Sequence, residues 1–372
     1  MCGAYSNRAL GALQLQIELV AVQPFMRLED YLDGGAFAAK IAALGEQVAA
    51  ARERDAAGRF RHPALVVFPE HIGTFLSAAG YADLLRPGDD VDALLRRVVL
   101  RRPLRLFGAM LRHRTVSPAA AVLLAESAKM HRIYRTAFAA VARRLEATVV
   151  AGSIILPEAA DDPDAEPFRA RDSRLYNLSY TFGPDGRCAG VTRKVHLVPT
   201  LEDTLPLTPG DAAAIRPIDT ACGRVGVLIC YDGFAEPHTE REPHFQPLGA
   251  RLAASGVEIV AQPSANPWPW NERWVFCGPG ERQLRREQWL TEGLYSQLPA
   301  MPGVRYAVNP QLIGDLLGTR FDGRSYIFSR DEHGATTILA SAEREALDPA
   351  SEQIVIARVP AIARTVTRAA SA

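Results

Sequence analysis

A short apolar run that ends in a cysteine constrains this chain more than any other stretch. Residues Val225 to Ile229 are mostly branched and apolar, which is typical of a strand buried on both faces of a sheet. The run stops at Cys230-Tyr-Asp-Gly, so a sharp turn presents one sulfur at the edge of the sheet. Catalytic nucleophiles are exposed in this way, beside backbone N–H groups that face the same point. The alternative is an unreactive thiol, since free cysteines are commonly small buried hydrophobic residues.

Two further strand ends carry side chains that could serve such a thiol. The apolar run Ala64–Phe68 is followed by a proline, which stops strand pairing, and then by Glu70. Lys194 ends a segment that comes after a predicted hairpin at 183–186. A carboxylate can take the proton of a thiol, and an ammonium can stabilise an oxyanion. Taken one at a time, Glu70 is more readily explained as a surface acid and Lys194 as a solvated cation.

The order Glu70, Lys194, Cys230 in these three contexts resembles the nitrilase superfamily of carbon–nitrogen hydrolases, and in particular its amidase-like branch. The resemblance covers nearly the whole chain, from a strand at 15–23 to a strand at 353–359. It implies an α/β protein built as a four-layer α-β-β-α sandwich, often assembled as homodimers or larger homo-oligomers. Minor family features recur at Ala151-Gly-Ser153, at 261–266 and at 321–327.

The resemblance also implies roles for the site residues. Glu70 would act as the base, and Cys230 would attack the substrate carbon to form a thioester. Lys194 and the backbone N–H of Tyr231 would stabilise the oxyanion. Glu202 stands where family members carry a second glutamate, and would orient Lys194 or the substrate. No step needs a metal or an organic cofactor.

Other site assignments are less specific. Asp203 competes with Glu202 for the place of the second glutamate. Phe75, Trp268 and Trp270 are candidate apolar walls for the acyl group of a small-molecule substrate, although core or interface packing explains each of them equally well.

The residues after the cysteine bear on the substrate. Nitrile-cleaving family members typically carry Trp-Glu after the cysteine, whereas this chain has Tyr231-Asp232. We therefore expect an amide or carbamoyl amide, with nitrile hydrolysis as the second interpretation. A soluble amide-forming acyltransferase and a non-catalytic binding protein on the same scaffold remain as alternatives. A Cys–His hydrolase of another fold would have to pair Cys230 with one of four histidines, namely His71, His196, His238 or His244.

Composition limits the partners and the compartment. The chain has 372 residues with 42 basic and 42 acidic side chains, so it lacks the basic surplus of nucleic-acid-binding proteins. Its five cysteines show no C-x-x-C spacing, which argues against a zinc site or a disulfide framework. The chain also lacks a signal-peptide pattern and an apolar run of about 18 residues. We therefore expect a cytoplasmic enzyme.

We expect a single domain over 1–372, because no stretch resembles a linker. The chain between Glu70 and Ala151 is longer than expected for the family. The extra length lies at residues 86–117, which are both basic and apolar. We expect a helical hairpin broken at Pro103 that covers the site entrance or a subunit contact, rather than one that binds an anionic membrane. Periodicity predicts helices over 36–56, 127–145, 248–254 and 281–295, and strands over 15–23, 64–68, 148–156, 175–182, 187–192, 225–229, 257–261, 304–308, 325–329, 336–340 and 353–359.

Overall fold

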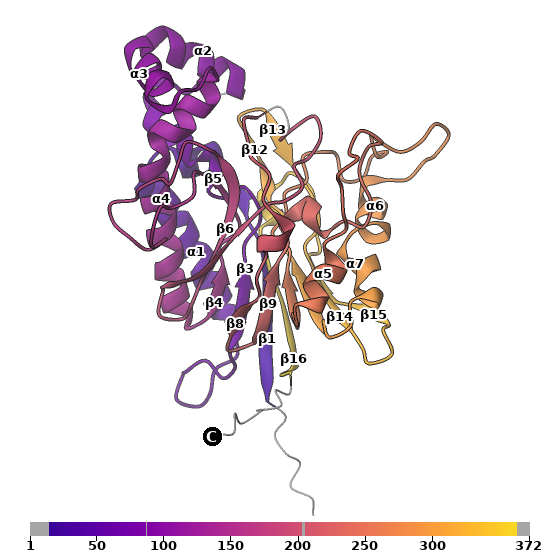
Figure 1. Cartoon of the computed structure of the whole chain (residues 1–372). Coiled ribbons are helices and arrows are strands. Elements are labelled where there is room, and N and C mark those ends of the chain that lie inside the picture. The colour runs from indigo at the N-terminus through magenta and orange to yellow at the C-terminus, as the bar shows by residue number, and fades with distance from the viewer. Residues whose placement is uncertain (1–14, 87, 203–204, 363–372) are drawn as a thin grey trace, which may run out of the picture.

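The computed structural model describes residues 15–86, 88–202 and 205–362. Two large sheets lie face to face, with helices over their outer surfaces (Figure 1). The first sheet has seven strands in the order β16-β1-β3-β4-β6-β5, and β7 also pairs with β6. Its strands are β1 (Gln16–Gln23), β3 (Ala64–Val67), β4 (Thr148–Val150), β5 (Ile154–Leu156), β6 (Tyr176–Phe182), β7 (Cys188–Arg193) and β16 (Gln353–Pro360).

The second sheet has six strands in the order β15-β14-β11-β10-β9-β8, and a third, small sheet has the order β13-β12-β2. The six strands are β8 (Ile218–Thr220), β9 (Gly223–Val227), β10 (Ile259–Ala261), β11 (Tyr306–Asn309), β14 (Tyr326–Arg330) and β15 (Thr336–Ser341). The small sheet is formed by β2 (Phe25–Met26), β12 (Ile313–Leu316) and β13 (Thr319–Phe321).

The α-helices are α1 (Gly34–Ala51), α2 (Val91–Arg101), α3 (Pro103–His113), α4 (Pro118–Leu145), α5 (Gly249–Ala254), α6 (Arg285–Thr291) and α7 (Leu294–Gln297). Short 3-10 helices are η1 (Leu28–Tyr31), η2 (Thr74–Leu84), η3 (Ala212–Ala214), η4 (Cys230–Gly233), η5 (Leu298–Ala300) and η6 (Pro349–Ser351).

The alternation of side chains along β1 explains the layers. Ile17, Leu19 and Ala21 enter the apolar core shared with the second sheet and helices α5 to α7. Val20 and Val22, on the opposite face, pack in a separate core with α1 and α4. Successive residues of a strand point to opposite faces, so a strand that is buried on both sides must lie between two layers. The expected α/β class is confirmed, and the order of layers agrees with the implied sandwich.

Three predicted elements differ from the observed ones. The single strand expected over 148–156 is interrupted at Gly152, which has a φ of 71°. A Cβ at this position would lie 2.0 Å from the carbonyl oxygen of Pro69, so only glycine lets the two segments approach. The helix expected over 281–295 is divided into α6 and α7, which begins just after Gly293. Helix α4 begins at 118, nine residues earlier than predicted, because Ser117 caps it through the N–H of residue 120.

The segment expected to form a helical hairpin does so, as α2 and α3 meet at Arg102 and Pro103 and project from one end of the molecule (Figure 1). Arg102 donates to the carbonyl of Gly80 at 2.8 Å and pairs with Asp83 at 2.5 Å, which holds the hairpin against η2. Seven of the twelve large hydrophobic side chains that are exposed among the described residues lie between 91 and 116. The outer face of the hairpin is therefore unusually apolar.

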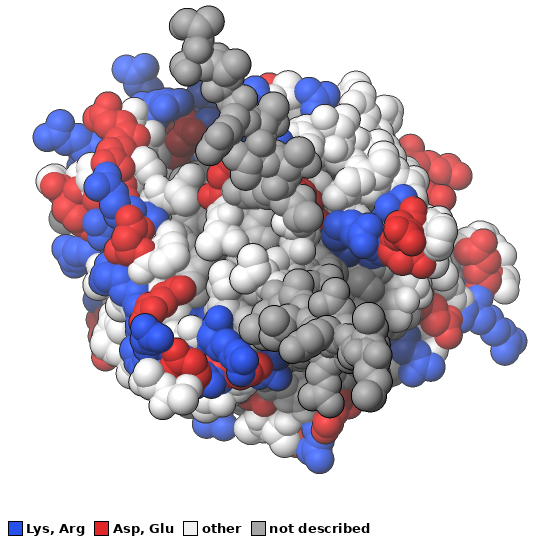
Figure 2. Space-filling model, turned by 90° about the horizontal axis from the view of Figure 1, so that it is seen from below, with Lys and Arg blue, Asp and Glu red and all other residues white. Residues whose placement is uncertain are grey.

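The rest of the surface is mixed in charge. Figure 2 views the end of the molecule away from the hairpin, where basic and acidic side chains are interspersed around the rim. Within the part of the chain that the structure covers, no helix is both long enough and apolar enough to cross a membrane.

The contact between Gly152 and the segment before Glu70 leads to a stability prediction. Gly152→Ala should lower the free energy of unfolding by about 3 kcal/mol or more, because it adds a backbone clash to the cost of a left-handed alanine. Gly58→Ala is the matched control, since Gly58 has a similar φ of 77° but open space around its Cβ position. That variant should lose about 1–2 kcal/mol in urea unfolding. Equal losses for the two variants would contradict the proposed contact.

Candidate active site

Three of the predicted site residues converge on one buried ammonium group. Lys194 comes directly after β7, and its Nζ lies 2.7 Å from Oε1 of Glu70 and 2.5 Å from Oε2 of Glu202. Glu70 comes after β3, and Glu202 lies in the loop after Lys194, where its Oε2 also accepts the N–H of Val198 at 2.9 Å. All three side chains are almost completely buried. Of the two acids proposed for the second-glutamate position, Glu202 makes these contacts, and Asp203 lies outside the described residues.

Asn177 completes this cluster, although the sequence analysis did not identify it. Its Nδ2 donates to Oε1 of Glu70 and to Oε1 of Glu202, both at 2.9 Å. Asn177 lies on β6, whose residues are all buried. The only signal in the sequence was a polar amide within a mostly apolar strand, and buried polar groups require partners.

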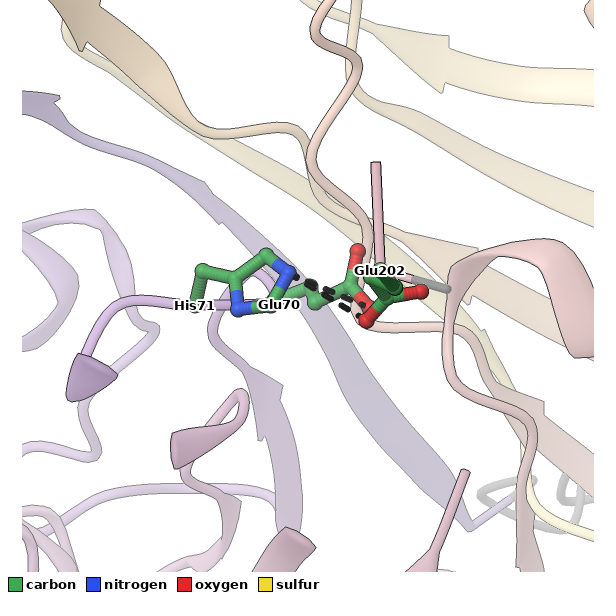
Figure 3. A group of neighbouring side chains, drawn as sticks. All are labelled: Glu70, His71 and Glu202. Carbon is green, nitrogen blue, oxygen red and sulfur yellow. Dashed lines mark ion pairs between the residues drawn. The ribbon is translucent and has the colours of Figure 1, made fainter. Parts of the chain in front are cut away.

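His71 lies at the edge of the same cluster, and Figure 3 shows its imidazole directed toward the carboxylates of Glu70 and Glu202. Its Nε2 is 3.5 Å from Oε1 of Glu202 and 3.9 Å from Oε1 of Glu70. The backbone of His71 is left-handed, with a φ of 58°, and its N–H donates to Oγ of Ser153 at 2.9 Å. The break in the strand at Gly152 therefore helps to fix the turn that carries Glu70 and His71.

The cluster contains side chains that metals use as ligands. Potential ligand atoms of Glu70, His71 and Glu202 all lie within 4.8 Å of one another. The ammonium of Lys194 already supplies a positive charge to both carboxylates at hydrogen-bond distance. A divalent cation bound here would face repulsion from that ammonium, so the donor set fits an internal ion pair better than a metal site.

Burial and charge act in opposite directions on these groups. Burial disfavours the charged form of Lys194, but the carboxylates of Glu202 and Glu70 outweigh it and raise the pKa of the ammonium. Burial would raise the pKa of Glu202, but Lys194 and the hydrogen bond from His71 lower it well below its ordinary value. Lys194 and Glu202 therefore stabilise each other's charged forms.

Cys230 begins η4, at the turn predicted from the sequence, and has a left-handed φ of 49°. Its N–H donates to the carbonyl of Pro263, and its own carbonyl accepts from Nε2 of Gln262, both at 2.8 Å. A non-glycine residue in this conformation is strained, and such strain is found where a turn must aim a side chain. Gly233 is required in the same turn, because a Cβ there would lie 2.1 Å from Nε2 of Gln262.

The thiol of Cys230 is buried beside the charged cluster. Burial raises the pKa of this thiol, the carboxylate of Glu70 raises it further, and the ammonium of Lys194 lowers it. The thiol is therefore protonated at neutral pH and needs a base before it can act as a nucleophile. Its Sγ lies 3.8 Å from the carbonyl oxygen of Ala265.

The two residues after the cysteine connect this turn to its surroundings. The carboxylate of Asp232 accepts the N–H of His196 at 2.7 Å and the N–H of Val195 at 3.1 Å, so it ties the Cys230 turn to the segment after Lys194. The hydroxyl of Tyr231 donates to Glu242 at 2.7 Å. Both side chains therefore hold the backbone in place, and Asp232 does not face the ammonium.

A cavity of about 310 Å³ opens onto the cluster, and its walls include Glu70, Lys194, Glu202 and Ala265. This volume is within the range of small-molecule sites. The side chain of Phe75 lines the cavity as expected. Ala265 also contacts the sulfur of Cys230, so the thiol lies next to the cavity wall.

The two tryptophans expected to line the acyl site do not line this cavity. Trp270 is buried in the core around the second sheet. Trp268 packs against the guanidinium of Arg285, whose carbon lies 4.9 Å from the centre of the indole and 3.9 Å from the ring of Trp274. Burial lowers the pKa of Arg285 to about 9, and cation–π contacts of this kind stabilise a desolvated guanidinium. The sequence analysis did not identify this arginine.

The charge of Glu202 leads to a pH-dependent prediction. Glu202→Gln should lower the free energy of unfolding at about pH 7 by about 3 kcal/mol or more, because a buried ammonium loses one partner. The pKa of this carboxyl is lowered on folding, so its stabilisation is present above the unfolded pKa of about 4.3 and is lost as the pH falls below it. The difference from wild type should therefore shrink below about pH 4.

Glu46→Gln is the control for this experiment. Glu46 forms an exposed ion pair with Arg144 at 2.8 Å, and such pairs contribute at most about 1 kcal/mol. Urea unfolding of both variants across the pH range gives the comparison. A Glu202 variant as stable as the Glu46 variant at neutral pH would rule out the buried charge pair as a stabilising unit.

Comparison with known sequences gives relatives for part of the chain. The sequence pattern of the carbon-nitrogen hydrolase family matches residues 21–275. The chloroplastic omega-amidase of Arabidopsis thaliana is 34% identical over 132 residues, covering 34% of this chain and 29% of the relative. Human omega-amidase NIT2 is 34% identical over 99 residues, covering 25% of this chain and 32% of the relative. The chain thus spans about a third of the length of the curated relatives that it matches.

Solved structures share the fold over most of both chains. A carbon-nitrogen hydrolase from Helicobacter pylori G27 has a TM-score of 0.53 at 18% identity, covering 93% of this chain and 89% of its own. Saccharomyces cerevisiae Nit3, a member of branch 10 of the nitrilase superfamily, has a TM-score of 0.52 at 19% identity, covering 93% and 90%. These likenesses show the fold, and the family match over more than half of the sequence shows that the chain belongs to the carbon-nitrogen hydrolase family.

Proposed function

We propose that this protein hydrolyses a non-peptide C–N bond of an amide through a thioester on Cys230. The observation that supports this most is the convergence of Glu70, Lys194 and Glu202 at a cavity whose wall also touches the sulfur. A buried base, a buried cation and a strained thiol turn are the groups that acyl transfer to sulfur requires. The omega-amidase relatives support an amide substrate.

The proposed reaction has two halves. Glu70 takes the proton from Sγ of Cys230, and the thiolate attacks the amide carbon. The negative charge on the oxygen is stabilised by Lys194 and by the backbone N–H of Tyr231. Glu70 then gives its proton to the nitrogen, the C–N bond breaks, and ammonia or an amine leaves the thioester. In the second half, water loses a proton to Glu70, attacks the thioester carbon and releases the acid and the thiol.

Glu202 and Asn177 act on this reaction as positioning residues. Both contact groups of the charged cluster, and Glu202 pairs with the same ammonium as Glu70. Because two carboxylates share one lysine, a proton that moves from the thiol to Glu70 leaves Lys194 still paired with Glu202. The ammonium can then also stabilise the developing oxyanion, because the carboxylate of Glu202 still pairs with it inside the protein.

Replacement of the nucleophile tests the proposal directly. Cys230→Ala should lower kcat for a responsive amide by about 10⁴-fold or more, since removal of a nucleophile leaves only binding and electrostatic effects. Mass spectrometry of acid-quenched wild-type protein should detect the acyl group on this residue. Cys277→Ala is the control, because its Sγ contacts the carbonyl of Glu281 and lies outside the cluster, and it should retain activity. Full activity of the Cys230 variant would refute the mechanism.

Nitrile hydrolysis is the second candidate function, because the same thiolate attack can begin it. The replacement of Trp-Glu by Tyr231-Asp232 favours the amide. The comparison to make is kcat/KM for an amide and a nitrile that share one acyl group. We expect the amide to be preferred, and a nitrile preference of about tenfold, or about 1.4 kcal/mol, would reverse this assignment. Ammonia release without an added amine acceptor separates hydrolysis from acyl transfer.

We further propose that residues 1–372 form one domain with an inserted hairpin, and that the protein assembles as a homodimer or a larger homo-oligomer. The apolar outer face of α2 and α3 supports an interaction surface there, since exposed apolar patches commonly mark binding sites. Light scattering of the intact protein tests the oligomer. Binding to anionic vesicles that is lost when 86–117 is deleted would instead favour the membrane alternative.

A further inference from the structure

The cavity at the charged cluster has one polar end and a long apolar remainder. Its charged lining residues, Glu70, Lys194 and Glu202, lie together with His71 at the reactive end. Most of the remaining wall is made of apolar side chains from several separate segments, among them Phe75, Leu94, Val98, Leu123 and Phe321. A cavity of this kind gains binding free energy mainly from apolar surface.

Helix α2 of the hairpin forms one complete wall of this cavity. Val91, Leu94, Leu95 and Val98 all line it, and their spacing of three and four residues places them on one face of the helix. The helix is capped by Asp90, whose carboxylate accepts the N–H of residue 93 at 2.7 Å. The hairpin thus lines this cavity, and its cap helps to fix the start of α2.

The charges of the wall limit what can bind. Among the described lining residues, Lys194 and His71 are the only basic side chains, and both lie at the reactive end. Lys194 is already paired with two carboxylates. A carboxylate at the far end of a substrate would therefore lose its hydration without gaining a cationic partner, which is unfavourable.

We propose that the substrates are amides with an uncharged, apolar acyl chain of about six carbons or more, and that the inner face of α2 measures the length of that chain. This inference rests on the proposed amide hydrolysis and adds the chemical class of the acyl group. Leu95 on α2 and Ala119 on α4 line both the cavity and an outer groove that also includes Val99, Leu100 and Pro118, and Leu95 is the larger of the two. The side chain of Leu95 therefore limits the cavity where a longer chain would pass into the groove.

The first test compares substrates on the intact wild-type protein. Each methylene buried should raise kcat/KM about fourfold, so hexanamide, which has about four more methylenes than acetamide, should exceed it by about 250-fold. Adipamic acid has the same six carbons as hexanamide but ends in a carboxylate, and it should be at least about 100-fold poorer than hexanamide. Equal kcat/KM values for acetamide and hexanamide, or a preference for adipamic acid, would overturn the inference.

The second test replaces Leu95 with a larger side chain in one variant and with a smaller side chain in another. Leu95→Trp should lower the hexanamide-to-acetamide ratio by about tenfold or more, because the indole fills space needed by the fourth to sixth carbons. Leu95→Ala should raise the ratio of octanamide to hexanamide, because it joins the cavity to the groove. Leu104→Ala is the matched control, since Leu104 is 87% exposed on the same hairpin and lines neither space, and it should leave all ratios unchanged.

These outcomes separate the two levels of the proposal. Acetamide turnover by each variant reports whether the variant is folded and whether the reaction proceeds. If acetamide is hydrolysed but none of the ratios responds to position 95, the acyl-chain inference fails and amide hydrolysis stands. If the wild-type protein, folded by circular dichroism, hydrolyses no amide in the series, the proposed function itself fails.

Discussion

A lysine ammonium buried between two carboxylates is the interaction on which the rest of the site depends. An unpaired buried charge costs several kcal/mol, so the chain must bring Glu70 and Glu202 to Lys194 if that residue is to remain charged inside the protein. The first of these contacts joins residues 124 positions apart. The cluster therefore fixes the relative position of the segments after β3 and β7, and Asn177 on β6 donates a hydrogen bond to each carboxylate.

The backbone around the site is arranged so that these groups and the thiol stay together. Asp232 joins the Cys230 turn to the segment after Lys194 by accepting two backbone N–H groups. Gly152 allows the chain before Glu70 to approach the first sheet more closely than any side chain would permit. Such supports take no part in the chemistry, but they hold the reactive groups against the relaxation that a strained turn and a buried charge would otherwise favour.

The cavity at the site has one charged end, and the rest of its wall is mainly apolar. At the reactive end, burial raises the pKa of the Cys230 thiol and the carboxylate of Glu70 raises it further, so the thiol stays protonated until a base removes its proton. Beyond it lies the apolar wall contributed by α2, and low-polarity surroundings of this kind strengthen electrostatic interactions. The hairpin would thus affect the proposed reaction in two ways, through the polarity around the cluster and through the shape of the cavity.

The sequence alone was enough to predict the buried strands and to identify the polar residues that follow them. Alternation in β1 and the branched run before Cys230 predicted buried strands. Glu70, Lys194 and Cys230 were identifiable from their positions at the ends of predicted strands, with the family resemblance supplying their roles. The paired helices on either side of Pro103 were also predictable, because proline is tolerated at a helix start but interrupts a helix interior.

The tertiary structure decided everything that depends on contacts between distant segments. Asn177 joined the cluster only because β6 pairs with β7 and lies one strand away from β3, and its contact with Glu70 spans 107 positions. Neither tryptophan lines the cavity: Trp268 packs against the buried Arg285, and Trp270 lies in the core around the second sheet. The sequence could not predict the cavity wall formed by α2 for the same reason. Local periodicity defines the apolar face of a helix, but the fold of the whole chain decides which segments pack against that face.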